Sequence, residues 1–196
     1  MRVGDIRKQL RNTRSSLTPL QQLQAAEKVA KRITAQSFFL EARSIGAYLS
    51  NDGEIDPTNI VTQALELGMS CFLPVIAKQG TNTLDFAAYD RNTPMIENKF
   101  NILEPAASKG LIRKASQLDV IFVPLVGFDR SGSRIGMGGG YYDRALAFMD
   151  KEERDKPTLV GLAHSCQEVE YIDRQQWDIP LHLIATENEI ICAKQR

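Results

Sequence analysis

The sequence predicts an α/β fold, with a mostly parallel sheet that carries helices on both faces. Short apolar runs alternate along the chain with segments of helical period, which is typical of parallel strands joined by crossover helices. The run at 118–128 is apolar throughout, as a central strand covered on both faces should be. The chain has 196 residues and shows no internal repeat or evident linker, so we expect a single domain over residues 1–196.

The first third of the chain is predicted to begin with two helices. Apolar residues recur at helical spacing from Ile6 to Ile33, with a break near 15–19. Thr18 followed by Pro19 is a favourable N-cap and first-turn pair, so the second helix should start there.

A strand and a third helix should follow. Residues 44–50 form a short apolar run that ends in the turn signal Asn-Asp-Gly-Glu. Asp56 and Pro57 then open a helix that runs to about Leu67, and Gly68 supplies its C-terminal stop.

The middle of the chain is less regular. Residues 71–76 and 84–89 are predicted as strands. Two prolines and a glycine interrupt any period in 90–117, so this stretch is predicted as a loop with a short helix near 108–116. Whether it closes over a substrate is left open.

The last third should contain one helix and the remaining strands. A Gly-rich segment follows the apolar run, and 141–149 then has the pattern of a helix. Residues 157–163 are predicted as a strand, and 182–187 with 190–193 supply the last one or two.

Composition and cysteine usage limit the classes of partner. Lysine plus arginine and aspartate plus glutamate both number 24, so no overall field draws the chain to nucleic acid or anionic lipid. The charged N-terminus and the lack of a long apolar run predict a cytoplasmic protein without a membrane segment. Three cysteines without paired spacing argue against a disulfide framework, and Cys71 and Cys192 lie in apolar runs where buried free thiols are expected.

A glycine-rich segment after the central apolar run is the strongest candidate for a ligand site. Four of the five residues from Gly136 to Gly140 are glycines, directly before a predicted helix whose first N–H groups favour anions. The spacing matches neither the P-loop nor the dinucleotide fingerprint, so the glycines alone fit a ligand loop or a flexible turn equally well. Arg134 favours a phosphate ligand, and Asp143 is either a helix cap or a Mg²⁺ ligand beside the phosphates.

The segment VPLVGFDRSGSRIGMGGGYYDRAL (123–146) resembles the signature of the 5-formyltetrahydrofolate cyclo-ligase family. The resemblance extends in order to IRKQLRNTRSSLT, AYLSNDGEID, KFNILEP and QEVEYIDRQQWDIPLHLIATE, and so covers nearly the whole chain. It implies a three-layer fold of the NagB/RpiA/CoA-transferase type. It also implies ATP as co-substrate, Mg²⁺ as metal ion and a monomeric enzyme with small-molecule substrates.

The resemblance also implies roles for residues on the nucleotide side. It places ATP against Arg7, Arg134, Ile135, Gly136, Met137, Gly138, Gly139, Gly140, Tyr141 and Tyr142, and Mg²⁺ against Asp143 and Asp178. The family pairs the basic residue at position 7 with another four positions earlier, where this chain has Val3 with Arg2 beside it. From the residues alone, Arg2, Arg7, Lys8 and Arg11 read as a solvated helix face, and Asp178 reads as a turn residue.

On the folate side, the resemblance implies that Glu54 binds the pterin ring. A carboxylate can accept two N–H bonds from a 2-aminopyrimidinone edge, although the residues alone favour a polar turn. The other implied folate contacts are Leu49, Phe100, Met137, Gly138, Gly139, Gly140 and Tyr141. His164 and His182 have no partner spacing for a metal or a triad and are expected to be structural.

The implied reaction is the ATP-dependent cyclisation of 5-formyltetrahydrofolate to 5,10-methenyltetrahydrofolate, with release of ADP and phosphate. The sequence offers no obvious general base for it. Two alternatives stay open: a sugar-phosphate isomerase or CoA-transferase-like enzyme on the same scaffold, and a non-catalytic folate- or nucleotide-binding protein.

Overall fold

The structure, a computed structural model, describes residues 2–77, 82–98, 101–106, 110–150 and 156–194. Within these residues eight strands form one sheet. In chain order they are β1 (Ser44–Gly46), β2 (Ser70–Ile76), β3 (Leu84–Tyr89), β6 (Ile112–Arg113), β7 (Val120–Pro124), β10 (Thr158–Leu162), β11 (Leu183–Ala185) and β12 (Ile190–Cys192). Their order across the sheet is β12-β11-β10-β7-β1-β2-β3-β6.

The centre of the sheet is parallel and its edges are antiparallel. The five strands β2, β1, β7, β10 and β11 pair in parallel, whereas β12, β3 and β6 join the edges in antiparallel register. Two small antiparallel pairs lie outside it: β4 (Met95–Glu97) with β5 (Leu103–Pro105), and β8 (Gly127–Phe128) with β9 (Arg134–Ile135).

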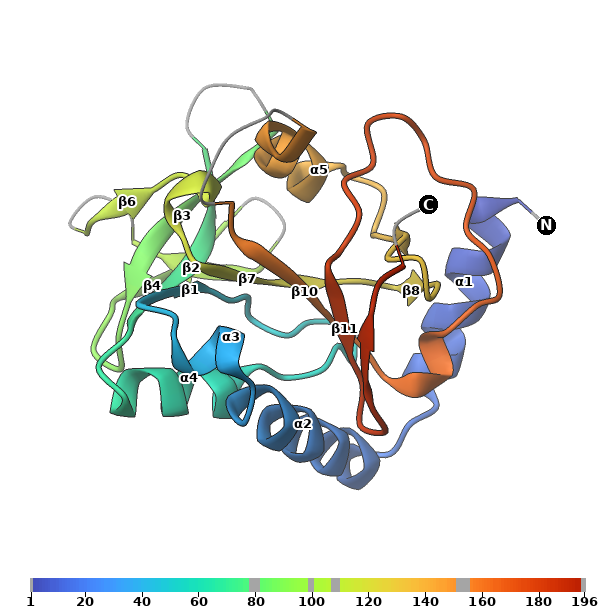
Figure 1. Cartoon of the computed structure of the whole chain (residues 1–196), viewed down its shortest axis with the longest axis horizontal. Coiled ribbons are helices and arrows are strands. Elements are labelled where there is room, and N and C mark those ends of the chain that lie inside the picture. Colours follow the sequence, from blue (N-terminus) through green and yellow to red (C-terminus); the bar gives the residue numbers. More distant parts are fainter. Residues whose placement is uncertain (1, 78–81, 99–100, 107–109, 151–155, 195–196) are drawn as a thin grey trace.

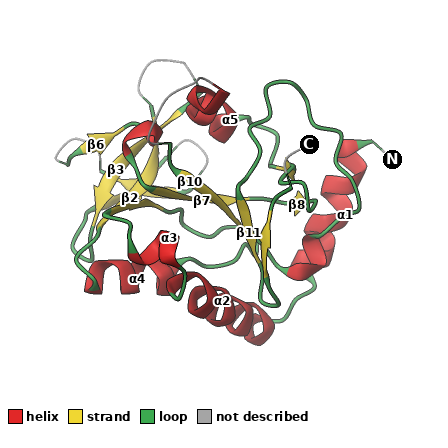
Figure 2. Cartoon of the chain, in the orientation of Figure 1, coloured by secondary structure: helices red, strands yellow, loops and turns green. Residues whose placement is uncertain are grey.

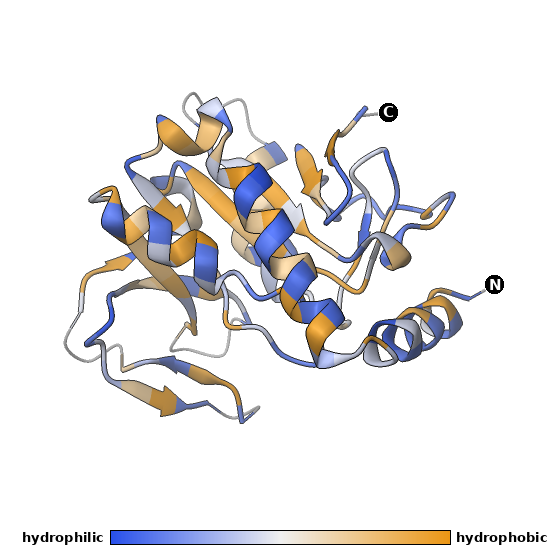
Figure 3. Ribbon diagram, turned by 90° about the horizontal axis from the view of Figure 1, so that it is seen from below, coloured by the Kyte–Doolittle hydropathy of each residue, from blue (hydrophilic) through white to orange (hydrophobic). Residues whose placement is uncertain are grey.

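Helices cover both faces of the sheet, as Figure 1 shows, so the predicted mostly parallel α/β fold is confirmed. On one face lie α2 (Pro19–Thr34), α3 (Ser37–Leu40) and α4 (Thr58–Glu66). On the other lie α5 (Tyr141–Leu146) and the 3₁₀ turns η1 (Ala115–Gln117) and η2 (Ala147–Asp150). Figure 3 shows α2 and α4 from their solvent side, where hydrophilic residues face outward.

Each face of the sheet has its own apolar core. Val29, Ile33 and Phe39 pack with β1 on the side of α2, whereas Leu146, Phe86 and Ile121 pack together on the side of α5. Burial of these side chains is the main term that stabilises the layers, at roughly 1.5–3 kcal/mol for each large apolar side chain.

Helix α1 (Val3–Ser15) stands apart from these layers, at the end of the sheet near β8 and η3 (Ser165–Gln167) (Figure 1). The apolar cluster that packs against it is small: Leu10 packs with Val126, Ile135 and Ile172. Thr18 caps α2 as predicted, because its hydroxyl accepts from the Gln21 N–H while the Gln21 side chain accepts from the Thr18 N–H.

Four predicted elements are wrong in their extent or type. The described part of 108–116 contains no α-helix; it forms β6, which pairs with β3 at the sheet edge, and then enters η1. The run at 118–128 is two strands, because after β7 the Val126 N–H donates to Ile135 and the chain leaves the sheet. The helix at 141–149 ends at Leu146 and tightens into η2, and the strand at 44–50 ends at Gly46.

The prediction for Cys192 is also wrong. Cys71 is buried, but Cys192 is exposed because β12 is an edge strand whose alternate residues point away from the core.

The long connection from η3 to β11 is loop along nearly all of its length (Figure 2). This loop carries Trp177 and Asp178.

Candidate active site

A cavity of about 800 Å³ opens where the parallel strands β1 and β7 end. Leu49 follows β1, Leu125 follows β7, and Pro74 and Ile76 of β2 extend the wall. Ligands of open α/β sheets bind at this edge, because the carboxyl ends of parallel strands and their loops converge there.

The cavity brings together every described residue that the sequence predicted for ligand or metal contact. They are Arg7, Leu49, Glu54, Arg134, Ile135, Gly136, Met137, Gly138, Gly139, Gly140, Tyr141, Tyr142, Asp143 and Asp178. Phe100, the remaining predicted folate contact, lies outside the described residues. Segments far apart in the chain therefore share one concave surface.

The glycine loop is held at both ends by arginines. Arg7 donates from Nε to the Gly136 carbonyl at 2.8 Å, and Arg144 of α5 donates to the Gly139 carbonyl. Gly138 and Gly140 have φ angles of 96° and 64°, a left-handed backbone that side chains other than glycine adopt only with strain. Within the described chain, no backbone N–H from Gly136 to Gly140 donates a hydrogen bond, so these donors are free for a ligand.

Arg134 lies on the inner wall beside two carboxylates. Its guanidinium donates to the Asp143 carboxylate and to the Ile179 carbonyl, and its side chain is 6% exposed. Burial lowers the pKa of this guanidinium, while the charges of Asp143 and Asp178 raise it. The two predicted metal ligands therefore share one buried cationic neighbour. Asp178 also accepts from the Gln175 N–H at 2.9 Å, which fixes its turn.

Glu54 also lines the cavity, at the end of the turn after β1. Its carboxylate accepts from the Asn51 N–H at 3.1 Å. Burial raises the pKa of Glu54 to about 7, against the lowering effects of the Asn51 N–H and of Arg14, and Asp52 adds to the rise. A half-buried carboxyl that binds a proton near neutrality can accept N–H donors from a ligand once it is ionised.

Tyr142 lines the cavity, and its hydroxyl is an unsatisfied donor. The oxygen is buried and has no hydrogen-bond partner among the described residues. Burial raises the pKa of this phenol, with a further rise from Glu54 and a lowering effect from Arg134. The charges of Glu54 and Arg134 therefore both act on this hydroxyl. A buried hydroxyl without a partner is uncommon in native proteins, and a ligand atom can supply the missing acceptor.

The basic residues of the N-terminal segment lie in two different environments. Arg7 is half-buried against the glycine loop and is not part of a solvated face, whereas Arg2, Lys8 and Arg11 are exposed. Val3 lines the cavity at the place where the family has its first basic residue. Arg14, which the sequence interpretation passed over, is fully buried. Its spacing from Arg7 and Arg11 at i, i+4 and i+7 was the available signal.

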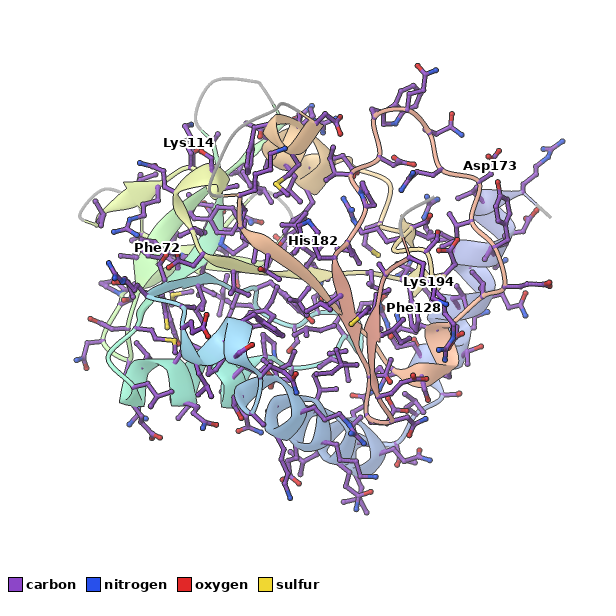
Figure 4. All side chains as sticks on the ribbon, viewed as in Figure 1. Phe72, Lys114, Phe128, Asp173, His182 and Lys194 are labelled. Atoms are coloured by element: carbon purple, nitrogen blue, oxygen red, sulfur yellow. The ribbon has the colours of Figure 1, made fainter. Side chains whose placement is uncertain are left out.

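Several further lining residues were not predicted. Trp177, Gln175 and Asp173 come from the loop before β11, and Asn98 and Glu104 come from the segment around β4 and β5. Figure 4 labels Asp173 on that loop, beside the N-terminal part of α1. Trp177 is 68% exposed although it lines the cavity. The sequence shows only that it is the single tryptophan of the chain, and its exposure is evident only in the structure.

Both histidines make structural contacts. His182 accepts from the Leu159 N–H through Nδ1 at 2.9 Å, between neighbouring strands (Figure 4). His164 Nε2 lies 3.1 Å from the Gly53 carbonyl. Among the residues that the structure describes, no three His, Cys, Asp or Glu side chains gather as a metal-ligand group. No helix in the described ranges is long and apolar enough to cross a membrane.

Comparison with known proteins gives a consistent result. The model of the 5-formyltetrahydrofolate cyclo-ligase family matches residues 2–187. The 5-formyltetrahydrofolate cyclo-ligase of Haemophilus influenzae is 37% identical over 177 residues, which cover 90% of this chain and 92% of that protein. The protein of the same name from Escherichia coli strain K12 is 35% identical over 181 residues, with coverage of 92% and 98%.

A solved structure supports the same assignment. The NMR structure of 5,10-methenyltetrahydrofolate synthetase from Aquifex aeolicus is similar with a TM-score of 0.82 and 28% identity, over 100% of this chain and 95% of that one. The structural match therefore extends over the whole of this chain. The chain belongs to the 5-formyltetrahydrofolate cyclo-ligase family.

Proposed function

We propose that this chain cyclises 5-formyltetrahydrofolate to 5,10-methenyltetrahydrofolate at the expense of ATP, which leaves as ADP and phosphate. The observation that carries the proposal is that Glu54, the glycine loop and Tyr142, whose hydroxyl has no partner among the described residues, line one cavity. Family membership favours this activity over the sugar-phosphate isomerase, CoA-transferase and non-catalytic alternatives.

The reaction has two steps. The formyl oxygen attacks the γ-phosphorus of ATP and the bond to the β-phosphate oxygen breaks, so that ADP leaves and the formyl carbon becomes strongly electrophilic. N10 then attacks that carbon, the C–O bond breaks, and phosphate departs with the proton that N10 loses. No protein nucleophile is required. Rate acceleration of this kind comes from positioning the two substrates and from offsetting charge on the phosphates.

The glycine loop and two arginines form the proposed phosphate side. The free N–H groups from Gly136 to Gly140 can donate to phosphate oxygens, and Arg7 holds the loop from behind through the Gly136 carbonyl. Arg134 can exchange its contact with Asp143 for a phosphate oxygen, since a guanidinium binds either anion. Ile135 and Met137 supply apolar contact along the same wall.

Asp143 and Asp178 are suited to bind the Mg²⁺ ion of a Mg·ATP complex. Mg²⁺ prefers one or two carboxylates together with phosphate oxygens, and these carboxylates already face one buried cation, Arg134. When bound there, the ion would neutralise charge on the phosphates. The role of the two aspartates is to hold this positive charge beside the loop.

Glu54 forms the proposed folate anchor on the other side. In its ionised form it can accept two N–H bonds from the 2-aminopyrimidinone edge of the pterin. Leu49 and Tyr141 line the same cavity and can give apolar and aromatic contact, and the apolar remainder of the cavity suits the flat ring. The ring would then point its formyl group towards the phosphate side, where Tyr142 lies.

We assign the Tyr142 hydroxyl to the phosphoryl group that moves between the substrates. Because its pKa is raised by burial, the phenol stays protonated and acts as a neutral donor, not as a base. A donor fixed where charge develops lowers the barrier without a cost for reorientation. The donor is available because no described protein group accepts from it.

The test is the absorbance of purified protein mixed with 5-formyltetrahydrofolate and Mg·ATP. Growth of the near-ultraviolet band of the methenyl product, only when ATP is present, is the expected result. Binding of the folate without growth of the band would favour a non-catalytic protein. The single-domain organisation over 1–196, the monomeric state, the cytoplasmic location and the lack of a nucleic-acid partner stay predictions.

A further inference from the structure

Arg14 is the one fully buried arginine among the described residues, and it lies below the turn that carries Glu54. Its side chain is 0% exposed and reaches from α1 into the protein. Nη2 donates to the Asp52 carboxylate at 2.7 Å, and Nη1 donates to the Leu125 carbonyl at 3.2 Å. Its Nε has no partner. A buried guanidinium is costly unless it is paired, so its position is determined by Asp52 and by the end of β7.

Asp52 is held in an uncommon backbone conformation. Its φ angle is 52°, in the left-handed region that few residues other than glycine adopt, and Gly53 follows with a φ angle of 75°. Arg11 and Arg14 both donate to the same carboxylate oxygen of Asp52, at 2.8 and 2.7 Å. These contacts stabilise a turn that the local sequence would not hold strongly alone.

The turn is fixed from a second direction by His164. Its Nε2 lies 3.1 Å from the carbonyl oxygen of Gly53, between Asp52 and Glu54. Glu54 in turn accepts from the Asn51 N–H, so both ends of the turn are connected to it. The position of the Glu54 carboxylate therefore depends on contacts made by Arg14 and His164, which do not line the cavity.

One face of α1 thus joins the two sides of the cavity. Arg7 holds the glycine loop through Gly136, whereas Arg11 and Arg14 hold the Glu54 turn through Asp52, at helical spacing. Because only a small apolar cluster docks α1, these polar contacts fix where the helix lies relative to both loops. We propose that Arg14, acting through Asp52, is a positioning residue that sets the Glu54 carboxylate for the folate substrate. This inference rests on the proposed function, in which Glu54 binds the pterin.

Asp52→Asn tests the inference without removing a buried residue. Asparagine tolerates a positive φ angle as aspartate does and keeps the size of the side chain, so the substitution removes mainly the charge. The dissociation constant for 5-formyltetrahydrofolate should rise about tenfold, as expected when a charge-assisted contact that orients the anchor is lost. The constant for ATP should change less than about twofold, since the glycine loop keeps its own contacts.

A matched control and a direct observation of the turn accompany this variant. Arg91→Gln removes an ion pair with Glu66 in which both side chains are largely exposed, and it should leave both dissociation constants unchanged. Amide hydrogen exchange of the ligand-free protein should become faster over residues 50–55 in Asp52→Asn and stay unchanged in Arg91→Gln. This measurement does not depend on the identity of the substrate.

The pH dependence of folate binding separates positioning from a general loss of structure. The charged or titratable groups that act on Glu54 are Arg14, Asp52, Tyr48 and Tyr142. Asp52 raises the pKa of Glu54 and Arg14 lowers it. The midpoint should therefore shift to lower pH in Asp52→Asn and to higher pH in Arg14→Met, and it should stay near that of the parent in Arg14→Lys, which keeps the charge.

Two outcomes would overturn the inference. Unchanged folate affinity in Asp52→Asn would show that the turn holds Glu54 without Arg14, and equal weakening of folate and ATP would show a structural effect on the whole cavity. Failure of the parent protein to bind 5-formyltetrahydrofolate at all would instead remove the proposed function, together with the inference that depends on it. If the parent converts the substrate and Asp52→Asn binds folate as tightly as the parent, only the inference about Arg14 is contradicted and the proposed function stands.

Discussion

Arg134 donates a hydrogen bond to the carboxylate of Asp143, nine positions further along the chain, inside the cavity. The two groups neutralise each other in the ligand-free protein. A Mg·ATP complex offers each of them a new partner of opposite charge, so binding can exchange one ion pair for two. The pair also affects how the site should be tested, because Asp143→Ala would leave a buried guanidinium without the carboxylate to which it donates.

We expect Asp143→Asn to lower ATP-dependent turnover by on the order of a hundredfold, because an amide cannot supply the negative charge that Mg²⁺ requires. The amide oxygen can still accept from Arg134, so the fold should persist. Asp143→Ala should in addition lower the free energy of unfolding by about 3 kcal/mol, the penalty for breaking a buried pair. Turnover and thermal unfolding of both variants check this, and parental turnover in Asp143→Asn would exclude Asp143 from the site.

Tyr142→Phe should lower kcat by roughly a hundredfold, as removal of one donor to a developing charge does. The KM for each substrate should change little. Because the Tyr142 hydroxyl has no protein partner, its removal should not reduce the melting temperature.

Tyr48→Phe provides the contrast. The Tyr48 hydroxyl donates to the Ile55 carbonyl at 2.7 Å, so its removal should cost about 1 kcal/mol of stability. A Tyr142→Phe protein that is destabilised like Tyr48→Phe and retains its kcat would show that Tyr142 is only structural.

Folate binding should strengthen as the pH rises through about 7, because burial raises the pKa of Glu54 to that value and only the ionised carboxyl accepts two N–H bonds. Titration calorimetry between about pH 5.5 and about 8.5 would measure this dependence, because that range extends well to either side of the expected midpoint. Glu54→Gln should bind more weakly at high pH and show no midpoint near neutrality. A parental affinity that does not vary with pH would count against the assignment of Glu54.

The raised pKa of Glu54 has the opposite consequence for stability, which falls with rising pH while folate binding strengthens. The folded state binds the Glu54 proton more tightly than the unfolded state, so between the ordinary pKa of 4.5 and about 7 stability falls as the pH rises. Glu54→Gln should thus exceed the parent in stability above pH 7, by on the order of 2 kcal/mol, and lose that advantage in acid. Melting temperatures of both proteins across this range would detect it, and parallel curves would contradict it.

Trp177 should report ligand binding, since it is the single tryptophan of the chain and lines the cavity while 68% exposed. A bound nucleotide or folate should cover the indole and protect its fluorescence from quenching by acrylamide. Trp177→Phe gives the background signal from tyrosine. Equal quenching with and without saturating ligand would place Trp177 outside the bound surface.

The sequence predicted the layers of the fold and the residues of the site more accurately than it predicted the bounds of individual strands and helices. Thr18 and Gly68 determine helix ends through nearby residues, so both were predictable. The strand β6 was not, because its pairing with β3 joins residues distant in the chain. The split of 118–128 depends on a hydrogen bond from Val126 to Ile135, which no periodicity reveals.

The electrostatic detail of the site was also beyond the sequence. Resemblance to the family implied Glu54, Arg134 and Asp143, but the burial of Arg14 and the missing partner of Tyr142 depend on how α1 and α5 pack. In the sequence Arg14 cannot be told from the exposed basic residues of α1, and only the structure shows that it is buried. Polar groups of this kind are placed by tertiary contacts rather than by local propensity.

The most direct test of the account follows the formyl oxygen. 5-Formyltetrahydrofolate labelled with ¹⁸O in its formyl group would be converted with unlabelled Mg·ATP, and the released phosphate would be examined by mass spectrometry. Transfer of the γ-phosphoryl group to the formyl oxygen within the shared cavity predicts one ¹⁸O atom in each phosphate. Phosphate without the label, formed together with the methenyl product, would contradict the proposed mechanism.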